Sequence, residues 1–105
     1  MARRSSQEGQ DLYLEVMAKV SVKNPIIVRP TKHTPLVVEG VGTTSIQEMS
    51  NRISQILATI ANGMQNDDDD AVLYLQESMS KGSELFKLVE GLNAAKQYVN
   101  ARRPI

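Results

Sequence analysis

The apolar positions between residues 45 and 62 recur at helical spacing and predict an amphipathic helix. Its seam, at intervals of three and four residues, consists of Ile46, Met49, Ile53, Ile56 and Ile60. Leu57 widens the seam. Ser45 and Glu48 form a Ser-x-x-Glu capping box, which marks the start of the helix. Asn62 and Gly63 predict its end, with Gly63 suited to the left-handed position that follows many helices.

A second helix is predicted over residues 69–100, beginning within the aspartates at 67–70. Negative side chains are favoured at a helix N-terminus, where free amides carry partial positive charge. Two apolar registers follow one another along this helix. The first contains Val72, Leu75, Met79, Gly82, Phe86 and Val89, and the second contains Leu85, Leu88, Leu92, Ala95 and Val99. Where they overlap, apolar side chains cover about half of the circumference, more than one neighbouring helix can bury.

The second helix raises a question of length. A continuous helix over residues 69–100 would extend about 48 Å, whereas a compact domain of this size has a diameter of about 33 Å. Either the helix breaks near Gly82 and the protein is a compact bundle, or the molecule is elongated and buries the overhang against other subunits. The wide apolar band slightly favours the elongated form. Gly82 and Gly91 each cost about 1 kcal/mol in a helix interior relative to alanine, so each predicts a bend or a close approach of another backbone.

The N-terminal part of the chain has a different pattern. Residues 1–10 are polar and predict a disordered tail, followed by a single small helical domain over residues 11–105. A short helix is expected from Gln10 to Val20, because its apolar residues share one face. These residues are Leu12, Tyr13, Val16, Met17 and Val20.

Segment 21–44 is predicted to be extended or loop-like, because it contains three prolines and two β-branched runs. Residues 26–29 and 36–39 either pair as a small β-hairpin or lie over the helices, and the prolines at their ends suit edge strands. Gly40 to Thr44 predict a flexible joint. The expected fold class is therefore mainly α: a C-terminal helical hairpin, a short N-terminal helix and a proline-containing extended segment.

Composition limits both the core and the chemistry. The chain of 105 residues is long enough for one small domain. It has no Trp, one Phe and three Tyr, so the core is expected to be aliphatic. The absence of Cys excludes a disulfide framework, thiol catalysis and thiolate metal sites. A chain this short leaves much apolar surface exposed, so contacts with other molecules are expected to contribute to its stability.

Charge and hydropathy restrict the partners. The 12 basic and 12 acidic residues balance, and neither half of the chain has the basic excess that nucleic-acid binding normally needs. No stretch approaches the roughly 18 apolar residues of a membrane span. Arg3 and Arg4 are not followed by an apolar run, so no signal peptide is predicted. We expect synthesis in the cytoplasm, and any export by a route without a cleaved signal.

The sequence contains no recognisable catalytic, cofactor-binding or metal-binding motif. Asp67–Asp70 are contiguous, whereas a calcium loop needs alternating carboxylates, a glycine at position six and a glutamate at position twelve. His33 is expected to lie in a loop, and no carboxylate or hydroxyl residue stands at a spacing that would indicate a catalytic pair. Gly40–Thr44 lack the lysine of a phosphate-binding Walker motif. The paired arginines at 102–103, like those near the N-terminus, suit solvated chain ends, and we expect neither an enzyme nor a cofactor.

The stretch from Ile53 to Val99 resembles the needle and inner-rod subunits of type III secretion systems. The turn Asn66–Asp70 and the start of the second helix, Ala71–Ser80, carry the resemblance. Those subunits are short chains, without a signal peptide and often without cysteine, in which a helix, a polar turn and a second helix pack into a helical tube. The resemblance implies export through the apparatus and polymerisation through the C-terminal helix.

Two non-enzymatic hypotheses follow. The protein is either a structural subunit that self-associates through its helices, such as a secretion needle or rod component, or a small adaptor, chaperone or regulator that binds one protein partner. The predicted interaction residues are Ile46, Met49, Ile53, Ile56, Ile60, Val72, Leu75, Met79, Leu85, Phe86, Leu88, Val89 and Leu92. The same stripes also fit an ordinary intramolecular core, and the two interpretations overlap because one helical hairpin cannot bury both registers.

Overall fold

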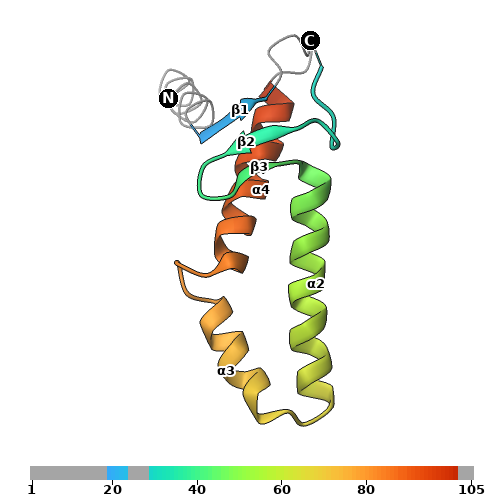
Figure 1. The fold of residues 1–105 in the computed structure, drawn as a ribbon, viewed down its shortest axis with the longest axis vertical. Helices are drawn as coiled ribbons and strands as arrows, with labels where there is room; N and C mark the ends of the chain where they lie inside the picture. Colours follow the sequence, from blue (N-terminus) through green and yellow to red (C-terminus); the bar gives the residue numbers. More distant parts are fainter. Residues whose placement is uncertain (1–18, 24–28, 102–105) are drawn as a thin grey trace, which may run out of the picture.

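The computed structural model describes residues 19–23 and 29–101 and shows a mainly helical protein with one small sheet (Figure 1). The strands are β1 (Val20–Val22), β2 (Leu36–Val38) and β3 (Gly42–Thr44), and the helices are α2 (Ile46–Gln65), α3 (Asp69–Ser78) and α4 (Glu84–Ala101). Helices α3 and α4 follow one another antiparallel to α2, and the sheet crosses one end of this pair. The predicted mainly α fold class with a C-terminal helix pair is confirmed.

The three strands form an antiparallel sheet in the order β1-β2-β3. Val20 of β1 pairs with Val38 of β2, and Val38 pairs in turn with Gly42 of β3. Val20, Leu36 and Val38 are buried, whereas Val37 points away and is 42% exposed. One face of the sheet therefore packs on the helices, as the period of two in a strand requires.

The structure corrects the predicted pairing of this segment. The extended segment at 36–39 is present as β2, but its partner is β1 and not residues 26–29, of which 24–28 lie outside the described part of the chain. Strand β2 is also central, although the flanking prolines predicted an edge. Pro35 stands just before the strand, where the ladder needs only its carbonyl, and this oxygen accepts a hydrogen bond from the Lys23 amide at 3.2 Å.

The predicted flexible joint at Gly40–Thr44 is wrong, because these residues form a tight turn followed by β3. Gly40 and Gly42 have φ values of 83° and 98°, in the left-handed region that glycine enters at little cost. The glycines therefore reverse the chain and bring β3 beside β2. The helix predicted from Gln10 to Val20 lies almost entirely outside the described residues, as does the predicted tail, but Val20 itself belongs to β1.

Helix α2 starts where predicted and ends later. The Glu48 amide donates to Ser45 Oγ at 3.1 Å, so Ser45 is the N-cap. The helix continues past Gly63 to Gln65, and Asp67, with φ of 54°, takes the left-handed position that the sequence assigned to Gly63. Gly63 instead allows close packing, because a Cβ built on it would lie 2.7 Å from the Ala71 Cβ.

The second predicted helix is broken between Ser78 and Glu84, in the region of Gly82, where a break was one of the two alternatives. Ser83 Oγ accepts a hydrogen bond from the Phe86 amide at 3.1 Å, as an N-cap does, and donates to the Ser78 carbonyl at 2.6 Å. The Ser83 hydroxyl thus bonds to the last residue of α3 and to the first turn of α4. The molecule nevertheless stays elongated, with principal extents of 51 × 37 × 21 Å.

The core lies where α4, α2 and the sheet meet. It is largely aliphatic, as expected, but Tyr98, 2% exposed, is among its largest fully buried side chains. Gly91 allows α4 to approach the sheet, because a Cβ there would lie 2.9 Å from Val41 Cγ2 and 3.0 Å from Val38 Cγ1. Among the described residues, no helix is long and apolar enough to cross a membrane.

A candidate interaction face along the helices

Helix α3 packs on α2 through a different stripe from the one that the sequence predicts. Ala71 and Ser78 are buried, and Leu75 packs against the core. Val72 and Met79, which share the predicted register with Leu75, are 48% and 70% exposed. The contact line therefore keeps Leu75 but replaces Val72 and Met79 with the residues that precede them, Ala71 and Ser78.

The second half of α2 and α3 project beyond the sheet as a two-helix arm, which we define as residues 53–80 (Figure 1). With only one neighbouring helix each, α2 and α3 cannot bury all of their apolar side chains here. The large apolar residues of the arm that remain exposed are Leu57, Met64, Val72, Leu73, Tyr74 and Met79. Isolated exposed apolar residues are common, but several on one face indicate a binding surface.

Four of these residues share one face of the arm. Each follows a residue of the α2–α3 contact line by one position: Leu57 after Ile56, Met64 after Gly63, Val72 after Ala71 and Met79 after Ser78. Each side chain therefore stands about a quarter of a turn from the contact line, in the same sense of rotation. In two antiparallel right-handed helices, that sense of rotation leads to the same face of the pair.

The same relation extends this face onto α4. Val89, 51% exposed, follows buried Leu88, and exposed Lys96 follows buried Ala95. The sheet covers the other side of α4, where Gly91 meets Val38. We call the surface formed by Leu57, Met64, Val72, Met79 and Val89 the open face.

The opposite face of the pair is polar, which supports this assignment. Arg52 precedes Ile53 and Glu84 precedes Leu85, and both of these apolar residues pack against the core. Arg52 and Glu84 form an ion pair with two hydrogen bonds. These bonds and the opposite charge lower the pKa of Glu84 and raise the pKa of Arg52. Tyr74 also precedes a packed residue, Leu75, and it lines the same hollow as Glu84, so Tyr74 lies on this face as well.

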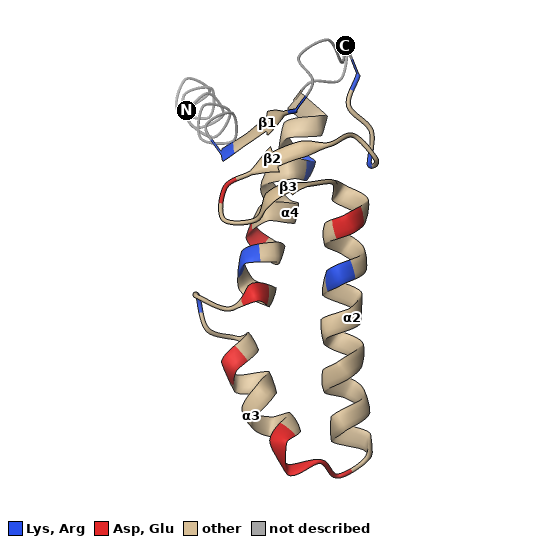
Figure 2. Ribbon diagram, viewed as in Figure 1, with Lys and Arg blue, Asp and Glu red and all other residues tan. Residues whose placement is uncertain are grey.

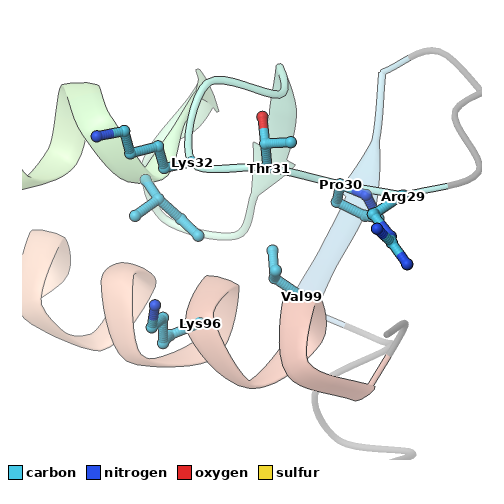
Figure 3. Close-up of a pocket in the computed structure, with 7 residues that line it drawn as sticks. Arg29, Pro30, Thr31, Lys32, Lys96 and Val99 are labelled. Atoms are coloured by element: carbon cyan, nitrogen blue, oxygen red, sulfur yellow. The ribbon is translucent and has the colours of Figure 1, made fainter. Parts of the chain in front are cut away.

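A basic hollow of about 580 Å³ lies at the sheet end of the helices. It is lined by Arg29, Pro30, Thr31, Lys32, Ile46, Lys96 and Val99. Figure 3 shows the loop from Arg29 to Lys32 on one side of the hollow and Lys96 with Val99 of α4 on the other. Because Lys96 lines the hollow and also lies on the side of α4 that continues the open face, the hollow is on the same side of the helices as that face.

Hydrogen bonds fix the loop that forms one wall of the hollow. The Thr31 amide donates to Thr34 Oγ1 at 2.7 Å, and the Lys32 carbonyl accepts from the Gln47 amide at 2.9 Å. Gln47 is in the first turn of α2, whose amides have no partner within the helix. The loop therefore stabilises the start of α2 while it holds Lys32 beside the hollow.

Charge is distributed unevenly along the molecule (Figure 2). The arm carries five acidic residues, Asp67–Asp70 and Glu77, and contains neither Lys nor Arg. The hollow at the other end of α2 presents Arg29, Lys32 and Lys96. The molecule therefore has an acidic tip and a basic end, separated by the length of α2, about 30 Å for its 20 residues.

The predicted interaction residues fall into two groups. Ile46, Met49, Ile56, Ile60 and Leu88 are buried in the core, and Ile53, Leu75, Leu85 and Leu92 pack against it. Val72, Met79 and Val89 are exposed on the open face, and Phe86 is half-buried. The predicted stripe of α2 thus lies in or against the core together with Leu85, Leu88 and Leu92 of α4, whereas Val72, Met79 and Val89 remain exposed.

Sequence reasoning missed the basic hollow, because its cations come from separate segments. Arg29 and Lys32 belong to a loop, and Lys96 lies more than 60 residues later. The acidic run at 67–70 was visible, and Asp68 has a structural role there, since its Oδ1 accepts from the Asp70 amide at 3.0 Å as the N-cap of α3. The arginine pairs at 3–4 and 102–103 lie outside the described residues.

Neither the site chemistry nor comparison points to a known activity. Within residues 19–23 and 29–101, no three carboxylate or imidazole groups gather as metal ligands. His33 is exposed in its loop, and its amide donates to Thr31 Oγ1 at 3.3 Å. No protein-family model, curated protein or solved structure matches the chain.

Proposed function

We propose that this protein is a non-enzymatic assembly subunit that self-associates through its helices, with the open face as the contact surface. The observation that carries the proposal is the shared side of the exposed apolar residues on α2, α3 and α4. Leu57, Met79 and Val89 are each more than half exposed. Their burial against another molecule would remove apolar surface from water at about 25 cal/mol per Å².

The size of the open face sets the expected affinity. Association must first offset about 4–15 kcal/mol of lost translational and rotational freedom. A face with only five apolar side chains and a polar surround leaves a small surplus after this cost, so we expect association to be weak. We therefore expect an equilibrium between monomer and oligomer that depends on concentration.

A needle or rod component of a secretion apparatus is the more specific form of this proposal. It is supported by the resemblance of residues 53–99 and by the antiparallel helices joined at an acidic turn. In this form the chain is made in the cytoplasm and exported without a cleaved signal peptide. Electron microscopy of concentrated protein tests this more specific form, which requires filaments of constant diameter.

A small adaptor or regulator is the alternative function. The open face would then receive a helix of a different protein, as helix-in-groove recognition does. The observation that separates the two functions is the composition of the native particle. A monomer that co-purifies with one partner at a fixed ratio favours the adaptor, whereas a particle of this chain alone favours the assembly subunit.

Sedimentation equilibrium over a concentration series tests self-association and the face that mediates it. We expect the double variant Leu57→Gln/Met79→Gln to weaken association by about tenfold or more, because both residues lie on the open face. Both side chains are exposed, so folding stability should change by less than about 0.5 kcal/mol each.

Leu73→Gln is the matched control for the open face. Leu73 is 59% exposed on α3. It lies two positions after buried Ala71, about 200° around the helix, so it points away from α2 and does not belong to the open face. Its replacement should leave association unchanged. A wild-type chain that stays monomeric at high concentration would contradict the proposed function, and an equal effect of Leu73→Gln would contradict the choice of face.

A further inference from the structure

We infer that two copies of this chain pack antiparallel, open face against open face, so that the acidic tip of each arm meets the basic hollow of the other copy. This inference rests on the proposed self-association and specifies its geometry. The occupant of the open face is thus a second copy, selected by charge.

The tip and the hollow are complementary in charge. Asp67–Asp70 surround the start of α3 and are all exposed. Because the arm contains no Lys or Arg, no basic side chain within residues 53–80 offsets their charge. Arg29, Lys32 and Lys96 are likewise exposed around the hollow. Opposite charges across an interface fix its register and accelerate encounter.

The positions of the two charged sites match an antiparallel arrangement. Ile46, which lines the hollow, begins α2, and Asp67 follows its end. Two α2 helices that overlap completely in opposite directions therefore place each tip over the partner's hollow. Lys96 stands on the side of α4 that continues the open face, so it points toward the same partner. Leu57 lies near the middle of α2 and would be central to such an interface.

Parallel packing of the same faces is disfavoured. It would place the five acidic residues of one arm beside the five of the other, and the cations of one hollow beside those of the second. Like charges placed against each other oppose association, and salt screens this repulsion only partly at short range. The antiparallel pair replaces both repulsions with attractions.

The antiparallel contact also has a consequence for the size of the assembly. Each copy contributes the same face, so the contact is two-fold and closes on itself. The inferred particle is therefore a dimer. A needle would need a further surface to join dimers, so a filament built from single copies along this face would overturn the inference.

Charge reversal tests the inference. The tip variant is Asp69→Lys/Asp70→Lys, the hollow variant is Lys32→Glu/Lys96→Glu, and the combined variant carries all four changes in one chain. Dissociation constants are measured by sedimentation equilibrium in about 0.05 M NaCl, where exposed charges are weakly screened. We expect the tip and hollow variants each to weaken the dimer by about tenfold or more and the combined variant to recover to within about threefold of wild type.

The combined variant separates the two packing directions. In antiparallel packing its lysine tip meets a glutamate hollow, so affinity returns. In parallel packing its lysines meet lysines and its glutamates meet glutamates, so affinity does not return. Lys87→Glu is the control for a single Lys96→Glu change, because Lys87 lies on the side of α4 that faces Gly40 and Val41. It should leave the dimer intact, and circular dichroism confirms that each variant is folded.

The outcomes separate this inference from the proposed function. A wild-type monomer at all concentrations and salt conditions would overturn both. A wild-type oligomer that is insensitive to the tip and hollow variants would overturn only the antiparallel geometry and leave self-association standing. A weaker dimer in about 0.5 M NaCl than in about 0.05 M NaCl, with recovery of affinity in the combined variant at low salt, supports the geometry.

Discussion

At the residue scale, three glycines in the predicted helical region have different surroundings. Gly63 and Gly91 lie at close contacts, where an added Cβ would approach neighbouring atoms within 2.7 Å and 2.9 Å respectively. Gly82 has no neighbour within 4 Å of that position. The sequence predicted a bend or a close approach at Gly82 and Gly91 without deciding between them, because both situations favour glycine at the position. The atoms around each glycine in the structure distinguish a close approach, at Gly91, from an open position, at Gly82.

We predict that Gly91→Ala destabilises the protein by about 1–2 kcal/mol. Overpacking against Val38 and Val41 costs about 1–3 kcal/mol, and the higher helix propensity of alanine returns part of it. Gly82→Ala is the matched control and should be neutral or slightly stabilising, because the site is open. Urea unfolding of both variants measures the difference. Equal stability of the two variants would contradict the close packing of α4 on the sheet.

A second residue-scale prediction concerns the break between α3 and α4. Ser83→Ala should lower the free energy of unfolding by about 1 kcal/mol, because it removes the N-cap of α4 and the hydrogen bond to the Ser78 carbonyl. Ser80→Ala, in the same turn, removes only an exposed bond to the Glu77 carbonyl and should have little effect. Thermal unfolding compares the two, and a larger loss for Ser80→Ala would refute the capping role of Ser83.

At the scale of elements, an exposed ion pair lies at the boundary between the arm and the rest of the helices. Arg52 of α2 and Glu84 at the start of α4 connect these two antiparallel helices on the side opposite the open face. The pair lies directly after the break, at the start of α4. Because both side chains are about half exposed, at 49% and 56%, its contribution to stability is small.

The pKa shift of Glu84 gives an element-scale prediction. Its pKa is lowered from the ordinary 4.5 by the hydrogen bonds from Arg52. The stabilisation is therefore fully present above pH 4.5 and disappears as the pH falls through the lower folded value. Melting temperatures of wild type and Glu84→Gln should differ slightly near neutral pH and converge in acid. A difference that grows below pH 4 would contradict this linkage.

At the scale of the whole molecule, the second helix shows how two alternatives can combine. The chain breaks near Gly82, as one alternative required, and remains 51 Å long, as the other required. It does so because α3 continues in line with α4 along α2 and does not fold back onto the core. The result is an arm whose apolar side chains have too few neighbours, and this shortage motivates the proposed assembly.

The local pattern of the chain determined the helical fold class, the start of α2 at Ser45, the acidic turn and the apolar seam of α2. These follow from residues close together in sequence, since caps and helical periodicity act over a few positions. Tertiary contacts decided the rest. The pairing of β1 with β2 joins residues far apart in the chain, and the way in which α3 packs on α2 leaves Val72 and Met79 exposed. The basic hollow also depends on packing that brings Lys32 and Lys96 to one place, because periodicity specifies which residues share a helix face and not what that face meets.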